Sequence, residues 1–408
     1  MNIKLHKSAL KNNCSITITG SKSESNRLLL LQALYPEICV DNISNSDDSK
    51  VMQNALQTES GVIDVHHAGT AMRFLTAYFA IQKGRDILLT GSSRMQERPI
   101  KVLVDALNQL GADISYSKKE GCPPIKIKGE ELVEHKVTLK ANVSSQYISA
   151  LLLIAPKLKN GLQLTLDGDI TSIPYIEMTL SLLNQIGVDT QFKDNIIVVK
   201  PFADKLEPKT IVVESDWSSA SYFFSIIALS EVGTQITLTA YKQDSLQGDS
   251  ALVKIYKNFG VETVYKDNAI TIKKVDNSQP TTINFDLKDS PDIAQTIAVT
   301  CFGMGIACNL KGLHTLKIKE TDRLEALKNE LEKLGAKVEV TNDSLYLHTS
   351  KKINENISIA TYNDHRMAMA FAPLALKMTL QIEDANVVSK SYPTFWNNLE
   401  ALDFEISR

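Results

Sequence analysis

The chain has 408 residues, of which 43% are hydrophobic and 22% charged, an ordinary balance for a globular protein. The formal net charge of −3 does not indicate a nucleic-acid surface, so any anion site must be local. No apolar run approaches the ~18 residues of a membrane span, and residues 1–15 lack the apolar core of a signal peptide. These features predict neither a nucleic-acid nor a membrane partner, and the length predicts two domains or several smaller ones.

The five cysteines are scattered along the chain, and none forms a CxxC pair. An odd number of unclustered cysteines indicates reduced thiols, a cytoplasmic protein and no metal site. Arginine is scarce, with eight residues among 44 basic ones, and is therefore expected where a planar, bidentate donor is needed. Four arginines lie in polar clusters far apart in the sequence, which suggests convergence on carboxylate or phosphate groups: Arg27, Arg98, Arg323 and Arg366.

In chain order, a strand is expected over residues 2–18, before a polar cluster at 22–27 that opens an apolar helix. Two series of motifs then repeat. One is a glycine that ends a helical pattern and precedes a hairpin-like segment, with spacings of 76, 73 and 75 residues. These glycines are Gly111, Gly187, Gly260 and Gly335.

The second series consists of small or polar residues that open unusually apolar helices, in steps of 75, 72, 75 and 72 residues. Its markers are Gly69, Ser144, Asp216, Pro291 and Asn363. With the opening at 22–27, the chain holds about six copies of one α/β repeat. Six repeats divide naturally into two halves of three, with the boundary expected at 209–214.

The helices at 148–155, 222–229 and 367–376 are apolar nearly all round, which predicts buried helices with the strands outside them. Buried helix N-termini need partners for their free N–H groups and favour an anion. These polar residues could also be simple N-caps, but that interpretation does not explain the accompanying Lys22, Arg27 and Arg366.

The segment 319–323, Lys-Glu-Thr-Asp-Arg, precedes another amphipathic helix that ends at Gly335. Read alone, the cluster is typical of a solvated charged helix end. In the repeat pattern it lies in a connection, not at a buried helix opening, so we expect it to face the gathered N-termini.

Nine polar segments, taken together and in order, resemble the 5-enolpyruvylshikimate-3-phosphate (EPSP) synthase family over nearly the whole chain. The matching segments are 22–27, 68–73, 96–100, 144–146, 172–175, 291–292, 319–323, 363–369 and Lys390. The resemblance implies a two-domain inside-out α/β barrel of six repeated α/β units, with buried helices and outer strands. The implied domains are 1–20 with 214–408, and 21–213, with the active site in the cleft between them.

The family transfers the enolpyruvyl group of phosphoenolpyruvate to the 5-hydroxyl of shikimate 3-phosphate. It does so by addition and elimination through a tetrahedral intermediate, with release of phosphate and without a metal or organic cofactor. The resemblance therefore implies two small-molecule substrates, a place in aromatic amino acid biosynthesis, a cytoplasmic location and a monomer.

The resemblance also implies roles for individual residues. Arg27 and Ser23 would bind the shikimate carboxylate. The remaining contacts to that substrate would come from Lys22, Ser144, Ser145, Gln146, Ser172, Tyr175, Asp292 and Lys319, the serines holding its phosphate. Phosphoenolpyruvate would be held at its carboxylate by Arg323 and Arg366 and at its phosphate by Arg98 and Lys390, with further contacts from Lys22, Gly69 and Gln146.

The chemistry requires a proton at the methylene carbon and removal of one from the attacking hydroxyl. By resemblance, Glu320 and Lys22 are the proton-handling groups near phosphoenolpyruvate and Asp292 is the base at the hydroxyl. His365 would orient Glu320 or shuttle a proton. Cations around Glu320 favour its carboxylate form whereas domain closure would oppose it.

Three residues depart from the family pattern: His67 and Phe74 replace the usual Asn and Pro, and Ile173 stands where many members carry a basic residue. Two alternatives remain. One is the sister enolpyruvyl transferase acting on UDP-N-acetylglucosamine, which typically uses a loop cysteine, for which Cys122 is the candidate. The other is a non-catalytic homologue that binds an anionic metabolite, which would not need the acids Asp292 and Glu320.

Overall fold

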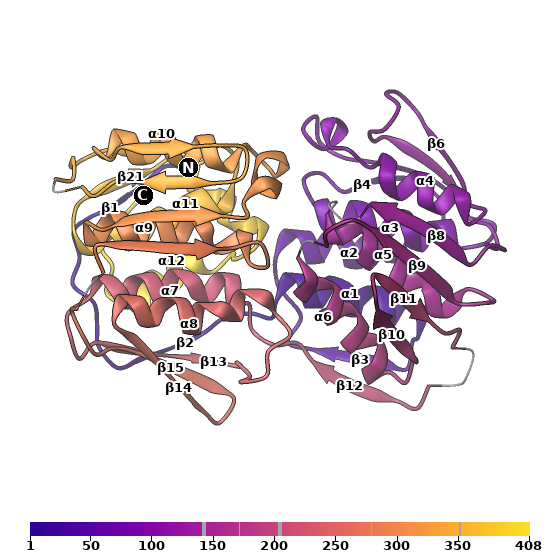
Figure 1. The fold of residues 1–408 in the computed structure, drawn as a ribbon, viewed down its shortest axis with the longest axis horizontal. Coiled ribbons are helices and arrows are strands. Elements are labelled where there is room, and N and C mark those ends of the chain that lie inside the picture. The colour runs from indigo at the N-terminus through magenta and orange to yellow at the C-terminus, as the bar shows by residue number, and fades with distance from the viewer. Residues whose placement is uncertain (141–143, 171, 203–205, 279, 351) are drawn as a thin grey trace. The chain divides into compact units, whose positions relative to one another are not determined.

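The computed structural model describes the chain from Met1 to Arg408 except residues 141–143, 171, 203–205, 279 and 351. The described residues form two compact units (Figure 1). The first unit combines Met1–Thr19 with Glu214–Arg408, and the second is Gly20–Val213. The chain therefore starts in the first unit, builds the second and returns.

The expectation of a single N-terminal strand over residues 2–18 is wrong. The segment forms β1 (Ile3–Leu5) and β2 (Cys14–Thr17), which belong to different sheets of the first unit. The residues between them are mostly polar, and Asn13 has a φ of 60°, a left-handed conformation that asparagine tolerates. That turn redirects the chain from one sheet to another.

The first unit contains three sheets in the part of the chain described, with strand orders β2-β13-β15-β14, β16-β17-β19-β18 and β20-β21-β1-β22. The remaining strands are β13 (Gln235–Thr239), β14 (Val261–Lys266), β15 (Ala269–Lys274), β16 (Thr282–Asp286), β17 (Ala307–Lys311), β18 (Val338–Val340), β19 (Leu345–Leu347), β20 (Ser358–Ile359), β21 (Leu380–Ile382) and β22 (Ile406–Ser407). The helices are α7 (Trp217–Leu229), α8 (Leu252–Ile255), α9 (Ala294–Met304), α10 (Arg323–Lys333), α11 (His365–Phe371) and α12 (Phe395–Ala401). Short 3₁₀ segments are η3 (Gly248–Ala251), η4 (Tyr256–Phe259), η5 (Pro291–Ile293), η6 (His314–Ile318), η7 (Ala372–Leu376) and η8 (Ala385–Lys390).

The second unit has the sheets β4-β5-β7-β6, β8-β9-β11-β10 and β12-β3 among its described residues. Its strands are β3 (Ile38–Asp41), β4 (Gly61–Asp64), β5 (Asp86–Thr90), β6 (Asp113–Tyr116), β7 (Ile125–Lys128), β8 (Lys136–Lys140), β9 (Leu162–Asp167), β10 (Thr190–Lys193), β11 (Ile196–Val199) and β12 (Lys209–Val212). Its helices are α1 (Lys22–Leu34), α2 (Asp47–Leu56), α3 (Gly69–Ala80), α4 (Lys101–Gln109), α5 (Ser145–Ile154) and α6 (Ile173–Gln185), with η1 (Met95–Glu97) and η2 (Ala155–Lys157).

Every four-stranded sheet has the same pairing pattern. The first two strands are parallel, as in β4 with β5, and the third and fourth add antiparallel, as in β7 with β5 and β6. The parallel pair needs a crossover, and a helix supplies it where the two strands are near in sequence, as α3 does between β4 and β5. Among the residues that the structure describes, the sheet of β3 and β12 is a reduced copy with only the parallel pair. The sixfold repeat expected from motif spacing is confirmed.

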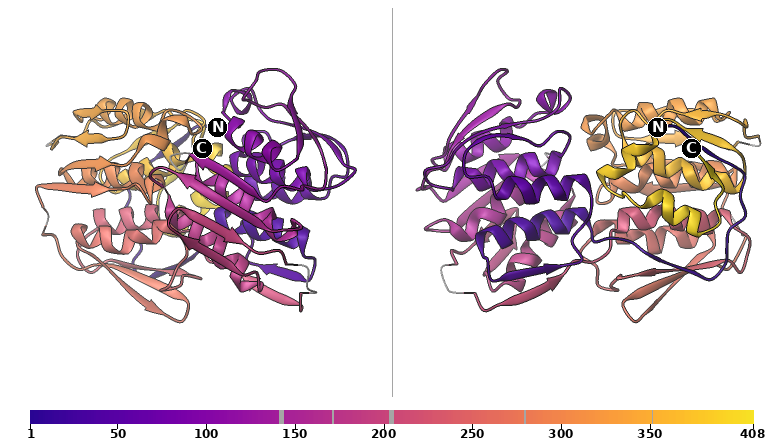
Figure 2. Two further views of the ribbon diagram at one scale, coloured as in Figure 1. Left: turned by 45° about the vertical axis from the view of Figure 1, so that its right-hand side comes forward. Right: turned by 180° about the vertical axis from the view of Figure 1, so that it is seen from behind.

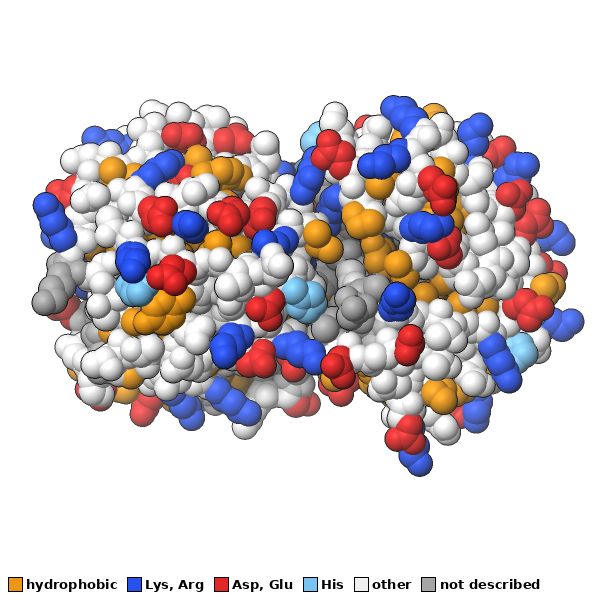
Figure 3. Space-filling model, turned by 45° about the horizontal axis from the view of Figure 1, so that its top comes forward, with side chains coloured by type: hydrophobic (Ala, Val, Ile, Leu, Met, Phe, Trp, Pro, Cys, Tyr) orange, Lys and Arg blue, Asp and Glu red, His pale blue; other side chains and the backbone are white. Residues whose placement is uncertain are grey.

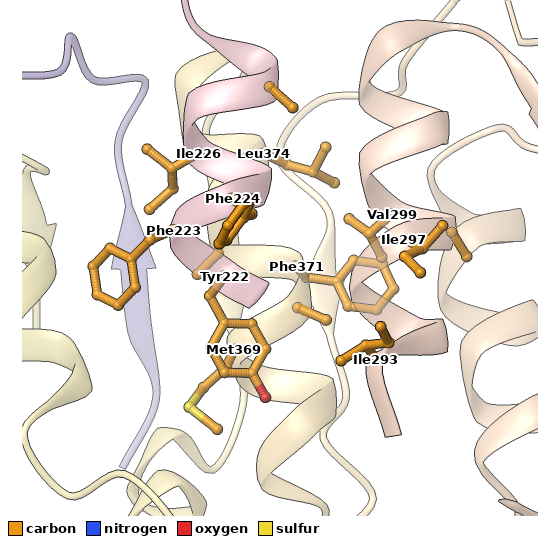
Figure 4. Close-up of a cluster of buried hydrophobic side chains, with 14 of the residues drawn as sticks. Tyr222, Phe223, Phe224, Ile226, Ile293, Ile297, Val299, Met369, Phe371 and Leu374 are labelled. Carbon is orange, nitrogen blue, oxygen red and sulfur yellow. The ribbon is translucent and has the colours of Figure 1, made fainter. Parts of the chain in front are cut away.

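The crossover helices are buried and the sheets lie outside them (Figures 1 and 2). All residues of α3 are buried, as are all residues of α7 except Ser218. In the first unit, aromatic and aliphatic side chains of α7, α9 and α11 converge, among them Phe224, Ile297 and Phe371 (Figure 4). The inside-out α/β fold class is therefore confirmed. It follows from helices with no polar face to turn to water.

The surface shows acidic and basic side chains interspersed over both units, with hydrophobic side chains in small groups (Figure 3). Large exposed hydrophobic residues such as Val62, Val133 and Val264 are spread along the sequence. None of the described helices combines the length and the hydropathy that crossing a membrane requires.

Candidate functional site

The first unit gathers charged side chains where α10 and α11 begin. Asp322 caps α10, because its carboxylate accepts hydrogen bonds from the backbone N–H groups of Leu324 and Glu325. This cap makes Arg323 the first residue of the helix, and its side chain is only 2% exposed. The segment 319–323 is therefore not a solvated helix end.

The Arg323 guanidinium donates to three carboxylates. Its Nε lies 2.6 Å from Asp364 Oδ2, its Nη1 lies 2.9 Å from Asp292 Oδ1, and its Nη2 lies 2.8 Å from Glu320 Oε2. Burial alone would lower the pKa of Arg323, but these three carboxylates raise it above its ordinary value. The charge-assisted bonds fix the guanidinium plane and hold the acids together.

Asp292 is the acid of this cluster that has three cations within ion-pair distance. Lys319 Nζ lies 3.4 Å from Asp292 Oδ1, and Arg366 Nη2 lies 3.3 Å from Asp292 Oδ2. Arg366 Nη1 also donates to the Asp292 carbonyl oxygen at 3.0 Å. Burial would raise the pKa of Asp292, but Arg366, Lys319 and Arg323 hold it well below its usual range. Asp292 is thus ionised and accepts hydrogen bonds as long as no bound anion offsets the charge of these cations.

Asp364 is a site residue that the sequence interpretation missed. It caps α11 by accepting from the Arg366 N–H at 2.9 Å, and the same carboxylate binds Arg323. Its place directly before His365 and Arg366, where an N-cap is expected, was the available signal.

His365 is 2% exposed, with Nδ1 3.9 Å from Asp364 Oδ1. Lys390 Nζ donates to the Asn363 carbonyl oxygen at 2.6 Å, which places Lys390 at the same helix start.

In the second unit, Arg27 occupies a different environment. Hydroxyl and carbonyl oxygens accept its hydrogen bonds: Thr179 Oγ1 at 2.8 Å, Ser149 Oγ at 2.9 Å, and the carbonyls of Ser23 at 2.7 Å and Tyr175 at 3.2 Å. Burial lowers the pKa of Arg27 to about 10. Thr179 and Ser149 were not expected in the site, although polar residues inside such apolar helices were a readable signal.

The starts of α5 and α3 are tied together by Gln146. Ser144 caps α5 by accepting from the Gln146 N–H at 3.4 Å, and Gln146 Nε2 donates to Thr70 Oγ1 at 3.1 Å. Ser145, the first residue of α5, is 8% exposed. Two serines at a buried helix N-terminus form a site suited to an anion.

Ser172 precedes α6 in a left-handed conformation with a φ of 56°. Such a conformation is uncommon for serine and often marks a functional position. Its carbonyl oxygen accepts from the Tyr175 N–H at 3.1 Å, and the Arg27 Cζ lies 5.9 Å from the centre of the Tyr175 ring. The structure therefore places Ser172, Tyr175 and Arg27 close together.

Lys22 and Arg98 lie near other groups of the second unit. Lys22 Nζ is 3.5 Å from Asp48 Oδ2, and His67 Nε2 is 3.9 Å from Asp48 Oδ1. Asp48, in the first turn of α2, was not predicted. Gly69 begins α3, and a Cβ atom there would lie 2.7 Å from Arg98 Nη1. Glycine is thus needed for the Arg98 guanidinium to lie against this helix start.

Two features bear on alternative chemistry. Cys122 is 7% exposed, and its Sγ donates to the Glu97 carbonyl oxygen at 3.6 Å, so its thiol is enclosed and bonded within the second unit. Within the described ranges, no group of three or more His, Cys, Asp or Glu side chains is placed to hold a metal ion. Each unit presents buried or half-buried cations at helix starts. Such cations suit small molecules that bear carboxylate and phosphate groups.

Comparison with known proteins agrees with this chemistry. Residues 53–399 match the family model described as EPSP synthase (3-phosphoshikimate 1-carboxyvinyltransferase). A 3-phosphoshikimate 1-carboxyvinyltransferase of Bacteroides fragilis (strain YCH46) is 47% identical over 397 residues, covering 96% of both chains. The enzyme of that name from Photorhabdus laumondii is 36% identical over 419 residues, again covering 96% of both chains.

Solved structures show the same fold. An EPSP synthase from Acinetobacter baumannii superimposes with a TM-score of 0.80 at 21% identity, over 100% of both chains. The enolpyruvyl transferase NikO from Streptomyces tendae gives a TM-score of 0.76 at 12% identity, over 100% of this chain and 98% of its own. With the family match over most of its length and relatives well above 30% identity, the chain belongs to the EPSP synthase (3-phosphoshikimate 1-carboxyvinyltransferase) family.

Proposed function

We propose that this protein transfers the enolpyruvyl group of phosphoenolpyruvate to the 5-hydroxyl of shikimate 3-phosphate and releases phosphate. The observation that carries the proposal is Asp292, a half-buried carboxylate held ionised by Lys319, Arg323 and Arg366. Such a constellation offers a base and cations at one place. Membership of the family supplies the reaction.

The two units are proposed to contribute different contacts. Arg27 and Ser23, with the serines Ser144, Ser145 and Ser172, bind the carboxylate and phosphate of shikimate 3-phosphate, and Tyr175 and Gln146 line its ring. The cations Arg366, Arg323, Arg98, Lys390 and Lys22 bind phosphoenolpyruvate. Support comes from the buried Arg27 cation with neutral acceptors and from Arg366, whose buried Nε has no hydrogen-bond partner among the described residues.

In the addition step, the substrate hydroxyl attacks C2 of phosphoenolpyruvate, its proton passes to Asp292, and C3 gains a proton. The low pKa of Asp292 makes it a weak base until substrate anions offset Arg366 and Lys319. The tetrahedral intermediate then loses a C3 proton and phosphate, which restores the double bond.

Glu320 and Lys22 are the proposed proton-handling groups at C3. Glu320 Oε2 accepts from Arg323 Nη2 at 2.8 Å, which favours the carboxylate form that can take the C3 proton in elimination. Donation in the addition step requires this contact to weaken as substrate binds. His365, buried beside Asp364, is proposed to help to position this acid cluster.

The test is phosphate release from shikimate 3-phosphate plus phosphoenolpyruvate, repeated with UDP-N-acetylglucosamine as acceptor. Turnover with the first acceptor alone is expected. Glu320→Gln should lower turnover about 10²-fold or more because it removes a proton-transfer group. Glu325→Gln, at an exposed position in the first turn of α10, is the matched control and should leave it unchanged. Folded protein that is inactive with the first pair would refute the proposal.

A further inference from the structure

Asp249 is a buried acid that the proposed reaction does not use. It lies in η3 and is 2% exposed. Its Oδ2 accepts a hydrogen bond from Ser218 Oγ, while its buried Oδ1 has no hydrogen-bond partner within the described part of the chain. A buried acceptor without a donor costs about 1–3 kcal/mol, so its presence calls for an explanation.

Ser218 links this acid to Arg366. The Ser218 hydroxyl donates to Asp249 and accepts from Arg366 Nη2 at 3.3 Å. A hydroxyl has one proton to donate and lone pairs to accept, so both bonds can exist together. The same Nη2 lies 3.3 Å from Asp292 Oδ2. Asp249 and Asp292 thus approach one nitrogen of Arg366, one through a hydroxyl and one directly.

The charges facing Asp249 come from several elements. Burial raises the pKa of Asp249 to about 7, and Asp292 of η5 and Asp216 at the start of α7 act in the same direction. Arg366 of α11 and the Ser218 hydrogen bond oppose them. The neighbouring α8 carries Lys254, which is exposed. Arg366 is therefore the cation that keeps a share of Asp249 ionised near neutral pH.

We propose that Asp249 is a positioning residue that acts on Arg366 through Ser218, and that it takes up a proton when a substrate carboxylate binds Arg366. A bound carboxylate offsets the Arg366 charge, which leaves Asp249 buried and close to Asp292. The ionised form of Asp249 competes for the guanidinium, and the protonated form releases it. The proposal rests on the function proposed above, in which that carboxylate belongs to phosphoenolpyruvate.

The consequence is a pH-dependent affinity. If the complex holds one proton more than the free protein, affinity falls as pH rises, by up to about tenfold per pH unit above the pKa of Asp249 in the free protein. Asp249→Asn is permanently neutral and resembles the protonated form. We expect this variant to lose the dependence and to have a lower KM for phosphoenolpyruvate than the wild type at pH 8.5.

The experiment measures kcat/KM for phosphoenolpyruvate from pH 6 to 9 at saturating shikimate 3-phosphate. Asp249→Asn should flatten the decline above pH 7. Ser218→Ala should weaken the decline and move it to higher pH, because the link to Arg366 and the hydrogen bond that favours the ionised acid are both lost. Asp244→Asn removes an exposed charge from the same connection and should follow the wild type. Calorimetry of phosphoenolpyruvate binding at pH 8 in buffers of different ionisation heat should show about one proton taken up by the wild type and none by Asp249→Asn.

A merely structural role would lower kcat/KM equally at every pH. That result would overturn the inference, and so would pH profiles like the wild type's in both Asp249→Asn and Ser218→Ala. In either case, turnover by the wild type would leave the proposed function intact. Absence of turnover by the wild type would remove both.

Discussion

Arg323 of the first unit and Arg27 of the second are both 2% exposed, yet their surroundings differ. Arg323 is held by three carboxylates, which raise its pKa, whereas Arg27 is held by hydroxyls and carbonyls, and burial lowers its pKa to about 10. The first guanidinium is largely neutralised by carboxylates, whereas the hydrogen-bond acceptors of the second carry no charge. We therefore expect Arg323 to hold the acids of the site together as well as to contact phosphoenolpyruvate, and Arg27 chiefly to bind a substrate anion.

The largest expected effect is the loss of stability on replacing Arg323, the arginine held by carboxylates. Arg323→Met leaves Asp292, Glu320 and Asp364 without the cation that they share. Removing one partner of a buried ion pair typically costs about 3–5 kcal/mol, so we expect that loss in the free energy of unfolding measured in urea. Arg408→Met, which breaks an exposed pair with Glu400, is the control and should cost under about 1 kcal/mol. Equal stability of the Arg323 variant and the wild type would contradict the assignment.

Arg27 is the buried cation expected to bind the shikimate carboxylate. Arg27→Met should lower kcat/KM for shikimate 3-phosphate by roughly 10²-fold, or about 2.7 kcal/mol, through loss of a charge-assisted contact to its carboxylate. The free energy of unfolding should fall less than in Arg323→Met, because the hydrogen-bond acceptors of Arg27 are neutral. An unchanged kcat/KM, measured by phosphate release, would remove Arg27 from the substrate site.

Lys274 is another buried cation whose hydrogen-bond partners are neutral. It is 1% exposed, and its Nζ donates to the carbonyl oxygens of Ala228 at 3.0 Å and Phe259 at 2.6 Å, where α7 and η4 end. Lys274→Met should cost about 1–3 kcal/mol of stability by leaving these carbonyls without a donor. Kinetic constants should not change. Lys273→Met, at the adjacent exposed position, should leave the urea midpoint in place.

The smallest effect is expected from Gly69→Ala. The added methyl group would displace the flexible end of Arg98 without disturbing the backbone, because its nearest neighbour is Arg98 Nη1. We expect KM for phosphoenolpyruvate to rise about tenfold, equivalent to about 1.4 kcal/mol, while KM for shikimate 3-phosphate and the unfolding midpoint stay the same. A rise in both KM values would show that α3 itself had moved.

Much of the architecture could be predicted from local patterns. The repeat spacing and the all-round apolar helices indicated buried crossover helices, and the motif order placed Arg27, Asp292, Glu320, Arg323 and Arg366 among the candidates. The failure was at the N-terminus, where β1 and β2 are separate strands of different sheets. Both segments are short and alternate alike, so only their pairing with β21 and β13 distinguishes them.

Periodicity and capping are local properties of the chain, so the family, the sixfold repeat and the polar helix starts could be predicted from the amino-acid sequence. Which partner each charge has depends on how distant segments pack. Asp364 binds Arg323 across 41 residues, and Thr179 binds Arg27 across 152. The separate environments of the two arginines, and the placing of Asp249 beside Arg366, depend on such long-range contacts. Burial and neighbouring charge, which set these pKa values, exist only after the helices have packed.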